Sequence, residues 1–289
     1  MSKVVVFYHG PECMDGLGAA AVLYSVYGNS AEYHPLQFGD ELPYHIDIKD
    51  AIVYFLDVCV DVKHMQEYVL TEAASVVVID HHKGTIDKYR DITDPKLDMS
   101  SCSVEFSGAM LTWNKFNKAG APPIISYIQD RDLWTFKYTY TKAYTAYLRY
   151  NIKSPFEMFE LFESNPVKTN KIIDEGGIIC NTEYKLCMNL ISENKRQINI
   201  INPLGESESW VMINAPAALS SDIGNIVAVD YPFVAIYSDS NKFRRFSLRS
   251  SPSFSGWRDV NEIAKQYGGG GHKNAAGFRV DRKHMLAMI

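Results

Sequence analysis

Short apolar runs alternate with longer segments of helical periodicity along the first part of the chain. Three runs rich in β-branched and aromatic residues, at 3–8 (KVVVFY), 51–56 (AIVYFL) and 75–79 (SVVVI), predict buried strands. Residues 15–26 (DGLGAAAVLYSV) have helical spacing and an acidic start, and Asp61 is placed to cap the helix that follows the second strand. Strands that alternate with helices predict a parallel sheet with helices on both of its faces.

The middle of the chain has a helical pattern, and strand-like runs return after it. Helices are predicted around 103–117 and 122–129, and residues 154–197 are mostly helical in pattern. The runs WVMINA, FVAIYS and RRFSLRS then predict strands, and a further helix is expected at 260–267. These elements predict a second, smaller α/β domain.

The length of 289 residues also suits two domains. We expect a first domain at 1–175, a linker helix at 176–198 and a second domain at 199–289, with a cleft between the two domains. The predicted fold class is therefore α/β: an N-terminal parallel-sheet domain covered on both faces, followed by a smaller C-terminal α/β domain.

Composition narrows the class of protein. Hydrophobic residues make up 46% and charged residues 22% of the chain, which supplies enough apolar surface for a folded core and excludes a disordered chain. No apolar run approaches the ~18 residues of a transmembrane helix, and the apolar stretch in MSKVVVFYHG is too short for a signal peptide. Five widely spaced cysteines predict no disulfide framework. We expect a reduced, cytoplasmic protein without a membrane partner, in an oligomeric state that stays open, a homodimer included.

The charges are unevenly distributed. The net charge is −5, which opposes tight capture of a long polyanion. Residues 199–289 nevertheless carry 10 Lys and Arg against 8 Asp and Glu, so the acidic excess lies in the first part of the chain. An acidic first part suits metal ions, and a mildly basic second part suits an anionic substrate.

Titratable side chains follow each of the three predicted strands. In an open parallel sheet, ligands bind beyond the carboxyl ends of the strands, so these side chains are expected at one edge. A single His or Asp after a strand is ordinarily a loop residue or a helix cap, and the common edge is what indicates a site. Carboxylates and imidazoles that converge there predict bound divalent cations. The candidates are His9, Asp57, Asp80, His81 and His82, with Asp15 at the start of the next helix and Asp130 and Asp132 closing the cluster.

A glycine tract at 268–271 opens the segment GGGGHKNAAGF. Four consecutive glycines cost backbone entropy and pack nothing, so they favour a place where main-chain N–H groups approach a ligand closely. Such a loop can form a nest for an anion. A flexible hinge is the alternative, although a hinge does not need His-Lys-Asn at its end. The candidate substrate-binding residues are Gly270, Gly271 and His272, with Arg249 as a further phosphate contact.

Taken together, these motifs resemble the DHH phosphoesterase superfamily over nearly the full length of the chain. The N-terminal markers are HGPECMDG, which contains His9 and Asp15, then Asp57 after a strand, Asp80-His81-His82, and Asp130. The C-terminal marker is GGGGH followed by AAGF, the signature of the DHH-associated domain. The tripeptide alone is a weak signal, whereas both signatures in this order are specific.

The resemblance implies a hydrolase with two divalent cations, Mn²⁺ first, with Mg²⁺ or Co²⁺ as alternatives. Asp57, His81 and His82 are the implied catalytic residues, and His82 would contact a phosphate oxygen. Asp80 would orient the neighbouring histidine. The implied metal ligands are His9 for one cation, Asp15 and His81 for the other, Asp57 between them, and Asp130 or alternatively Asp132 at the second site.

One position departs from the pattern of the superfamily. Many members carry an Asp four residues after the first His, and here that place is Cys13, preceded by Glu12. The segment is similar to a branch that includes oligoribonuclease-like members. Either Glu12 or Cys13 could ligate the first metal, and the site could bind more weakly or select a softer ion than Mn²⁺.

For the substrate, the resemblance implies short oligonucleotides or linear dinucleotides, hydrolysed to nucleoside monophosphates by metal-activated water, as in nanoRNase-like members. Cyclic dinucleotides and 3′-phosphoadenosine phosphate are alternatives, as is a single-strand exonuclease activity. A catalytically weakened nucleotide-binding module is the alternative of a different class.

Overall fold

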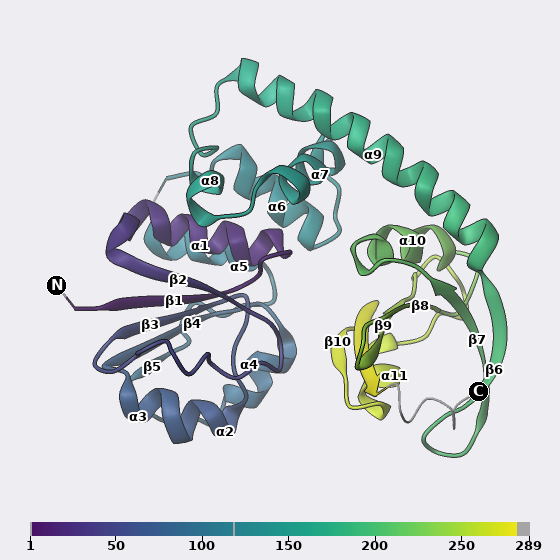
Figure 1. Ribbon diagram of the computed structural model, residues 1–289, viewed down its shortest axis with the longest axis horizontal. Helices are drawn as coiled ribbons and strands as arrows, with labels where there is room; N and C mark the ends of the chain where they lie inside the picture. Colours follow the sequence, from purple (N-terminus) through teal and green to yellow (C-terminus); the bar gives the residue numbers. More distant parts are fainter. Residues whose placement is uncertain (1, 118, 282–289) are drawn as a thin grey trace. The chain divides into compact units, whose positions relative to one another are not determined.

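The computed structural model describes residues 2–117 and 119–281. The chain divides into two compact units, Met1–Cys180 and Asn181–Ile289, and each unit is built around its own sheet (Figure 1). The long helix α9 (Pro166–Asn194) crosses the border between the units. It contains most of the linker predicted at 176–198 but begins ten residues earlier, at Pro166.

The sheet of the N-terminal unit has five strands, all parallel, in the order β2-β1-β3-β4-β5. The three strands predicted from apolar runs are present within one residue of their expected bounds. The two edge strands lack such runs, because β2 (AEYHPL) contains a proline and exposed polar residues. The strands are β1 (Val4–His9), β2 (Ala31–Leu36), β3 (Ile52–Leu56), β4 (Ser75–Ile79) and β5 (Leu97–Asp98).

Both faces of this sheet are covered, which confirms the predicted architecture. Successive side chains of a strand point to opposite faces, so Val4, Val6 and Tyr8 of β1 pack in one core cluster and Val5 and Phe7 in another. Figure 1 shows α1 and α5 over one face and α2 to α4 over the other. The helices of this unit are α1 (Met14–Tyr27), α2 (Val62–His64), α3 (Leu70–Glu72), α4 (Lys83–Tyr89), α5 (Gly108–Phe116), α6 (Pro123–Asp132), α7 (Thr141–Asn151) and α8 (Pro155–Phe159), with a 3₁₀ turn at Gly28–Ser30 and a π turn at Met65–Val69.

Asp61 caps α2 as predicted, since its side chain accepts a hydrogen bond from the backbone N–H of His64.

The C-terminal unit contains a six-stranded sheet in the order β10-β11-β9-β8-β7-β6. Its strand pairs are antiparallel except for β7 with β8. Helix α10 packs on one face and α11 on the other, which confirms the predicted second α/β domain. Its elements are β6 (Arg196–Ile201), β7 (Ser207–Asn214), a 3₁₀ turn (Ala217–Leu219), α10 (Ser220–Val227), β8 (Val234–Asp239), β9 (Phe243–Arg249), α11 (Val260–Gln266), β10 (Gly270–His272) and β11 (Ala275–Asp281).

Within residues 2–117 and 119–281, no helix combines the length and the apolar character needed to cross a lipid bilayer.

Candidate metal centre

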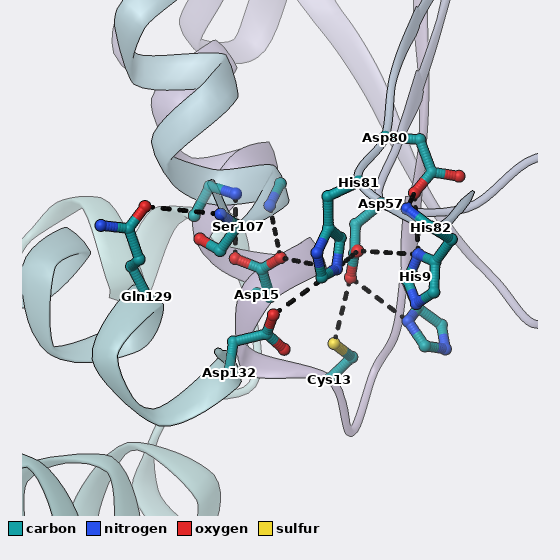
Figure 2. A network of polar contacts seen from close by, with 12 residues as sticks. His9, Cys13, Asp15, Asp57, Asp80, His81, His82, Ser107, Gln129 and Asp132 are labelled. Atoms are coloured by element: carbon teal, nitrogen blue, oxygen red, sulfur yellow. Dashed lines mark hydrogen bonds and ion pairs between the residues drawn. The ribbon is translucent and has the colours of Figure 1, made fainter. Parts of the chain in front are cut away.

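The candidate ligands lie where the strand order of the sheet changes direction. From β1 the chain goes to β2 on one side and then to β3 on the other. His9 is the last residue of β1, Asp57 follows β3, and the Asp80–His82 run follows β4. A crevice beyond the carboxyl ends of strands at such a switch point is where open α/β sheets bind ligands. Figure 2 shows these side chains pointing toward one another.

Asp57 is the centre of the cluster. Its Oδ2 lies 3.3 Å from Nδ1 of His9 and 3.3 Å from Sγ of Cys13, and its Oδ1 lies 3.2 Å from Nε2 of His81. Burial alone would raise the pKa of Asp57, but the hydrogen bonds with His81 and His9 outweigh it and hold the pKa below its usual range. The carboxylate is therefore ionised and contacts groups from three elements.

The backbone of Asp57 is in the left-handed region, with a φ of 58°. Few residues other than Gly, Asn and Asp adopt this conformation readily. The turn after β3 directs the carboxylate into the cluster, and the side chain is 2% exposed. A backbone in this sparsely populated region, at a cluster of this kind, is a feature typical of functional sites.

Asp15 is held by the amino terminus of α5. Its Oδ2 accepts a hydrogen bond from the Gly108 N–H (2.6 Å) and its Oδ1 from the Ala109 N–H (2.9 Å), while Ser107 caps the helix. The positive end of a helix stabilises a carboxylate placed there. Burial and the charges of Asp132 and Asp57 nevertheless raise the pKa of Asp15 well above its usual value.

Sequence reasoning missed Ser107 and Gly108. A hydrogen atom is all that fits at Gly108, because a Cβ there would lie 2.9 Å from Cβ of Asp57 and 3.0 Å from Oδ2 of Asp15. The signal was available in part: Ser-Gly before an apolar segment is a typical helix start. It would have moved the predicted helix start from 103 to 107.

Asp130 and Asp132 lie in different surroundings. Residues two positions apart on a helix point to nearly opposite sides, so α6 presents only one of them to the cluster. That residue is Asp132, whose Oδ2 lies 3.5 Å from Nε2 of His81. Burial raises the pKa of Asp132, which the charge of His81 only partly offsets.

The expectation that Asp130 joins the cluster is corrected by this geometry. Both oxygens of Asp130 accept hydrogen bonds from the chain that follows α6: from Thr135 Oγ1 (2.6 Å) and the Lys137 N–H (2.7 Å), and from the Tyr138 N–H (3.1 Å) and Thr141 Oγ1. Asp130 thus anchors the connection from α6 to α7. Burial would raise its pKa, but these hydrogen bonds outweigh it and lower the pKa to about 2.

His82 is oriented by Asp80. Oδ1 of Asp80 lies 2.7 Å from Nδ1 of His82 and accepts a hydrogen bond from the His82 N–H at 2.9 Å. Burial opposes the charged form of His82, but the hydrogen bond with Asp80 and the charge of Asp57 prevail and raise its pKa. For His81, burial is likewise outweighed by Asp57, Asp132 and Asp15, and the pKa rises to about 10.

The residues of the N-terminal unit fit bound divalent cations. Three overlapping groups each offer ligand atoms within 4.8 Å of one another: His9–Cys13–Asp57, Asp15–Asp57–His81 and Asp57–Asp80–His82. Burial raises the pKa values of Asp15 and Asp132, and the charges of neighbouring carboxylates raise them further, so a cation bound at the cluster would offset both effects. Glu12 is exposed and belongs to none of these groups among the described residues.

In the C-terminal unit, two of the candidate positions, Arg249 and His272, lie in one row across the sheet. Arg249 pairs with Ala275 of β11, and Ala275 pairs with His272 of β10. The Arg249 guanidinium donates to Ser221 Oγ and to the Leu248 carbonyl, both at 2.9 Å. Burial lowers the pKa of Arg249 to about 10.

The second half of the glycine tract is not the irregular loop that its composition indicated. Gly270 and Gly271 belong to the edge strand β10, paired with β11. A Cβ on Gly271, whose φ is 147°, would lie 2.6 Å from the Ala275 carbonyl oxygen, so the strand pair requires glycine there. Both glycines are exposed, which leaves their backbone accessible to a ligand.

Substitutions of Asp130 and Asp132 in α6 should have different effects, one on the stability of the fold and the other on cation binding. We expect Asp130→Asn to lower the free energy of unfolding by about 2–4 kcal/mol, since its amide would face two donors. Asp132→Asn should cost little stability and weaken divalent-cation binding. Chemical denaturation and calorimetric cation titration measure the two effects, and an Asp130 variant with normal stability would contradict this assignment.

The decrease in the free energy of unfolding caused by Asp130→Asn should also depend on pH. The folded-state pKa of about 2 lies below the ordinary value of 3.8. The stabilisation by Asp130 is therefore complete above about pH 4 and is lost as the pH falls toward 2. The difference in unfolding free energy between the two proteins should shrink over that interval, and a difference that grows there would contradict the expectation.

Comparison with known families bears on this geometry. Residues 3–130 match the family model described as DHH family, N-terminal domain. The matched segment runs from β1 into α6 and contains each candidate ligand of the N-terminal unit except Asp132. It supports the resemblance to the DHH superfamily that the motifs indicate.

Individual relatives are distant. The chain is 28% identical over 298 residues to uncharacterized protein R106 of Acanthamoeba polyphaga mimivirus, covering 95% of this chain and 66% of that protein, just under two thirds of its length. Two solved structures share the fold: a pGpG-specific phosphodiesterase, PggH, from Vibrio cholerae (13% identity, 98% of this chain and 94% of that chain, TM-score 0.51) and the exonuclease RecJ bound to manganese (15%, 99% and 87%, TM-score 0.54). At these identities the likeness shows the fold alone.

Proposed function

We propose that the protein is a metal-dependent phosphodiesterase that hydrolyses short oligonucleotides or linear dinucleotides to nucleoside monophosphates. The observation that carries the proposal is the cluster around Asp57, in which nitrogen, oxygen and sulfur ligands converge at the switch point of a parallel sheet. The family match over residues 3–130 supports the same chemistry.

The side chains of the cluster would hold two cations on either side of Asp57. His9 and Cys13 lie toward Oδ2 of Asp57, and His81, with Asp15 and Asp132 beside it, lies toward Oδ1. Divalent cations bound there, Mn²⁺ first among those expected and Mg²⁺ or Co²⁺ as alternatives, would supply an activated water and neutralise phosphate charge.

His82 would bind the scissile phosphate. Its Nδ1 contacts Asp80, so Nε2 is the atom that would donate to a phosphate oxygen. The raised pKa of His82 favours the charged form of the imidazole. A charged imidazole would bind the phosphate oxygen more strongly and would stabilise the negative charge that develops in the transition state.

The C-terminal unit would contribute recognition rather than chemistry. The exposed backbone of Gly270 and Gly271 and the row of His272 and Arg249 would bind a second phosphate or a sugar of the substrate. A substrate with two separated recognition points is expected, which suits an oligomer of two to a few nucleotides.

Two observations favour a short substrate over a long one. The net charge of −5 opposes retention of a long polyanion. One of the structural neighbours is described as specific for pGpG, itself a linear dinucleotide. The RecJ neighbour keeps a single-strand exonuclease as the second candidate, and a cyclic dinucleotide or 3′-phosphoadenosine phosphate would use the same two-cation chemistry.

Parallel hydrolysis assays test the proposal. The substrates are a 5′-phosphorylated RNA dinucleotide, a long single-stranded RNA, cyclic-di-AMP and 3′-phosphoadenosine phosphate, each with Mn²⁺ and with chelator. Fast, metal-dependent release of mononucleotides from the dinucleotide is the expected result. Preference for another substrate would replace the proposed one, and no turnover with any divalent ion would favour the nucleotide-binding module.

A further inference from the structure

The two halves of the cluster offer ligands of different chemical character. On one side of Asp57 are an imidazole nitrogen of His9 and the sulfur of Cys13. On the other are the carboxylates of Asp15 and Asp132 with the imidazole of His81. Thiolate and imidazole favour Zn²⁺, Co²⁺ or Fe²⁺, whereas carboxylate oxygens favour Mg²⁺ or Mn²⁺.

We propose that the cation site formed by His9, Cys13 and Asp57 uses Cys13 as a thiolate ligand and selects Zn²⁺, Co²⁺ or Fe²⁺ over Mg²⁺ and Mn²⁺, so that the centre holds two unlike metals. This inference rests on the proposed function for the presence of a second cation, but the selectivity of the Cys13 site can be measured without substrate.

The positions of the donor atoms support the assignment. A Zn–S bond of about 2.3 Å and a Zn–O bond of about 2.0 Å at a tetrahedral angle put sulfur and oxygen about 3.5 Å apart. Sγ of Cys13 and Nδ1 of His9 each lie 3.3 Å from the same carboxylate oxygen of Asp57. These separations, with all three donor atoms within 4.8 Å of one another, are close to those that a shared ion of this kind requires.

The chain fixes Cys13 in this place. Cys13 is the amino-terminal flanking residue of α1, with an extended backbone (φ −84°, ψ 117°), and its side chain makes no capping hydrogen bond to the helix. The Sγ instead donates to Asp57. On metal binding, the sulfur–metal bond would form as the thiol proton leaves to solvent. Of the two residues that the sequence left open, Cys13 contributes to a ligand group and the exposed Glu12 does not.

The test is a Co²⁺ titration of the metal-free, full-length protein followed by absorption spectroscopy. We expect a near-ultraviolet band from thiolate-to-cobalt charge transfer at one equivalent, displaced by one equivalent of Zn²⁺ and retained in excess Mg²⁺. Cys13→Ser should abolish the band and weaken Co²⁺ binding at this site at least about 100-fold, since loss even of groups that only orient a ligand costs 10–100-fold.

A matched control tests a second partly buried cysteine of the N-terminal unit. Cys102 is also partly buried, but its Sγ donates to the Val78 carbonyl and it belongs to none of the ligand groups in the described chain. Cys102→Ser should keep the charge-transfer band. Cys13→Asp should lose the band and bind Mn²⁺ more tightly than the wild type does.

The outcomes separate this inference from the proposed function. Metal-dependent hydrolysis without a charge-transfer band, or with a band that persists in Cys13→Ser, would overturn the thiolate site and leave the phosphodiesterase in place. A band that requires Cys13 in a protein that hydrolyses none of the four substrates would support the site and overturn the activity.

Discussion

Asp57→Asn is expected to lower phosphodiesterase turnover roughly 10³-fold, equivalent to about 4 kcal/mol of transition-state stabilisation. Asp57 belongs to all three ligand groups of the N-terminal unit, and an amide in its place would offer one neutral oxygen and turn an N–H₂ group toward some of the other ligands. The backbone should tolerate the change, because asparagine also adopts the φ of 58° found there. Steady-state hydrolysis of the RNA dinucleotide measures the effect.

Asp50 provides the matched control, because it has a φ of 55° and an exposed side chain outside the cluster. Asp50→Asn should keep wild-type turnover. The same pair of variants distinguishes an enzyme from a binding module: in a module, the wild type would turn over no dinucleotide and Asp57→Asn would leave dinucleotide affinity nearly unchanged. Wild-type turnover in Asp57→Asn would contradict the central role of this carboxylate.

Gly108→Ala is expected to lower kcat/KM about 10²-fold or more. The new methyl group would press on Asp57 and Asp15, and a shift of about 1 Å in a positioned group costs on that order. The methyl group would also overpack a closed site, at an expected cost of about 1–3 kcal/mol of stability. Hydrolysis assays and thermal unfolding on one preparation separate the two effects.

Gly84 is a suitable control for this substitution. It lies in α4 and is exposed, and a methyl group added there would meet no atom within 4 Å. Gly84→Ala should keep full activity and gain slightly in stability, since alanine is the better helix former. A Gly108→Ala protein with wild-type kcat/KM would show that α5 does not position Asp15 for the reaction.

The sequence predicted the site residues that directly follow an apolar run, because such a run marks a buried strand. His9, Asp57 and the Asp80–His82 segment each follow a strand that is buried on both faces, so their common edge could be predicted from the order of elements alone. The edge strand β2 could not be predicted in this way, because an edge strand with one exposed side does not need a continuous apolar run.

Other parts of the site depend on geometry that the sequence pattern does not carry. The choice between Asp130 and Asp132 depends on the rotation of α6 and on four hydrogen bonds with the following residues. The contribution of α5 comes from the N–H groups of Gly108 and Ala109, which every residue but proline possesses. Such backbone contacts leave no distinctive side chain to recognise.

The left-handed backbone at Asp57 limits which substitutions at this position could remove the carboxylate without destabilising the fold. Most replacements there would remove the carboxylate and also strain the turn after β3, so they would cost stability as well as activity. Asparagine and glycine are the exceptions, since both accept a positive φ. A lineage that abandoned hydrolysis for nucleotide sensing is therefore expected to carry one of these two residues at position 57.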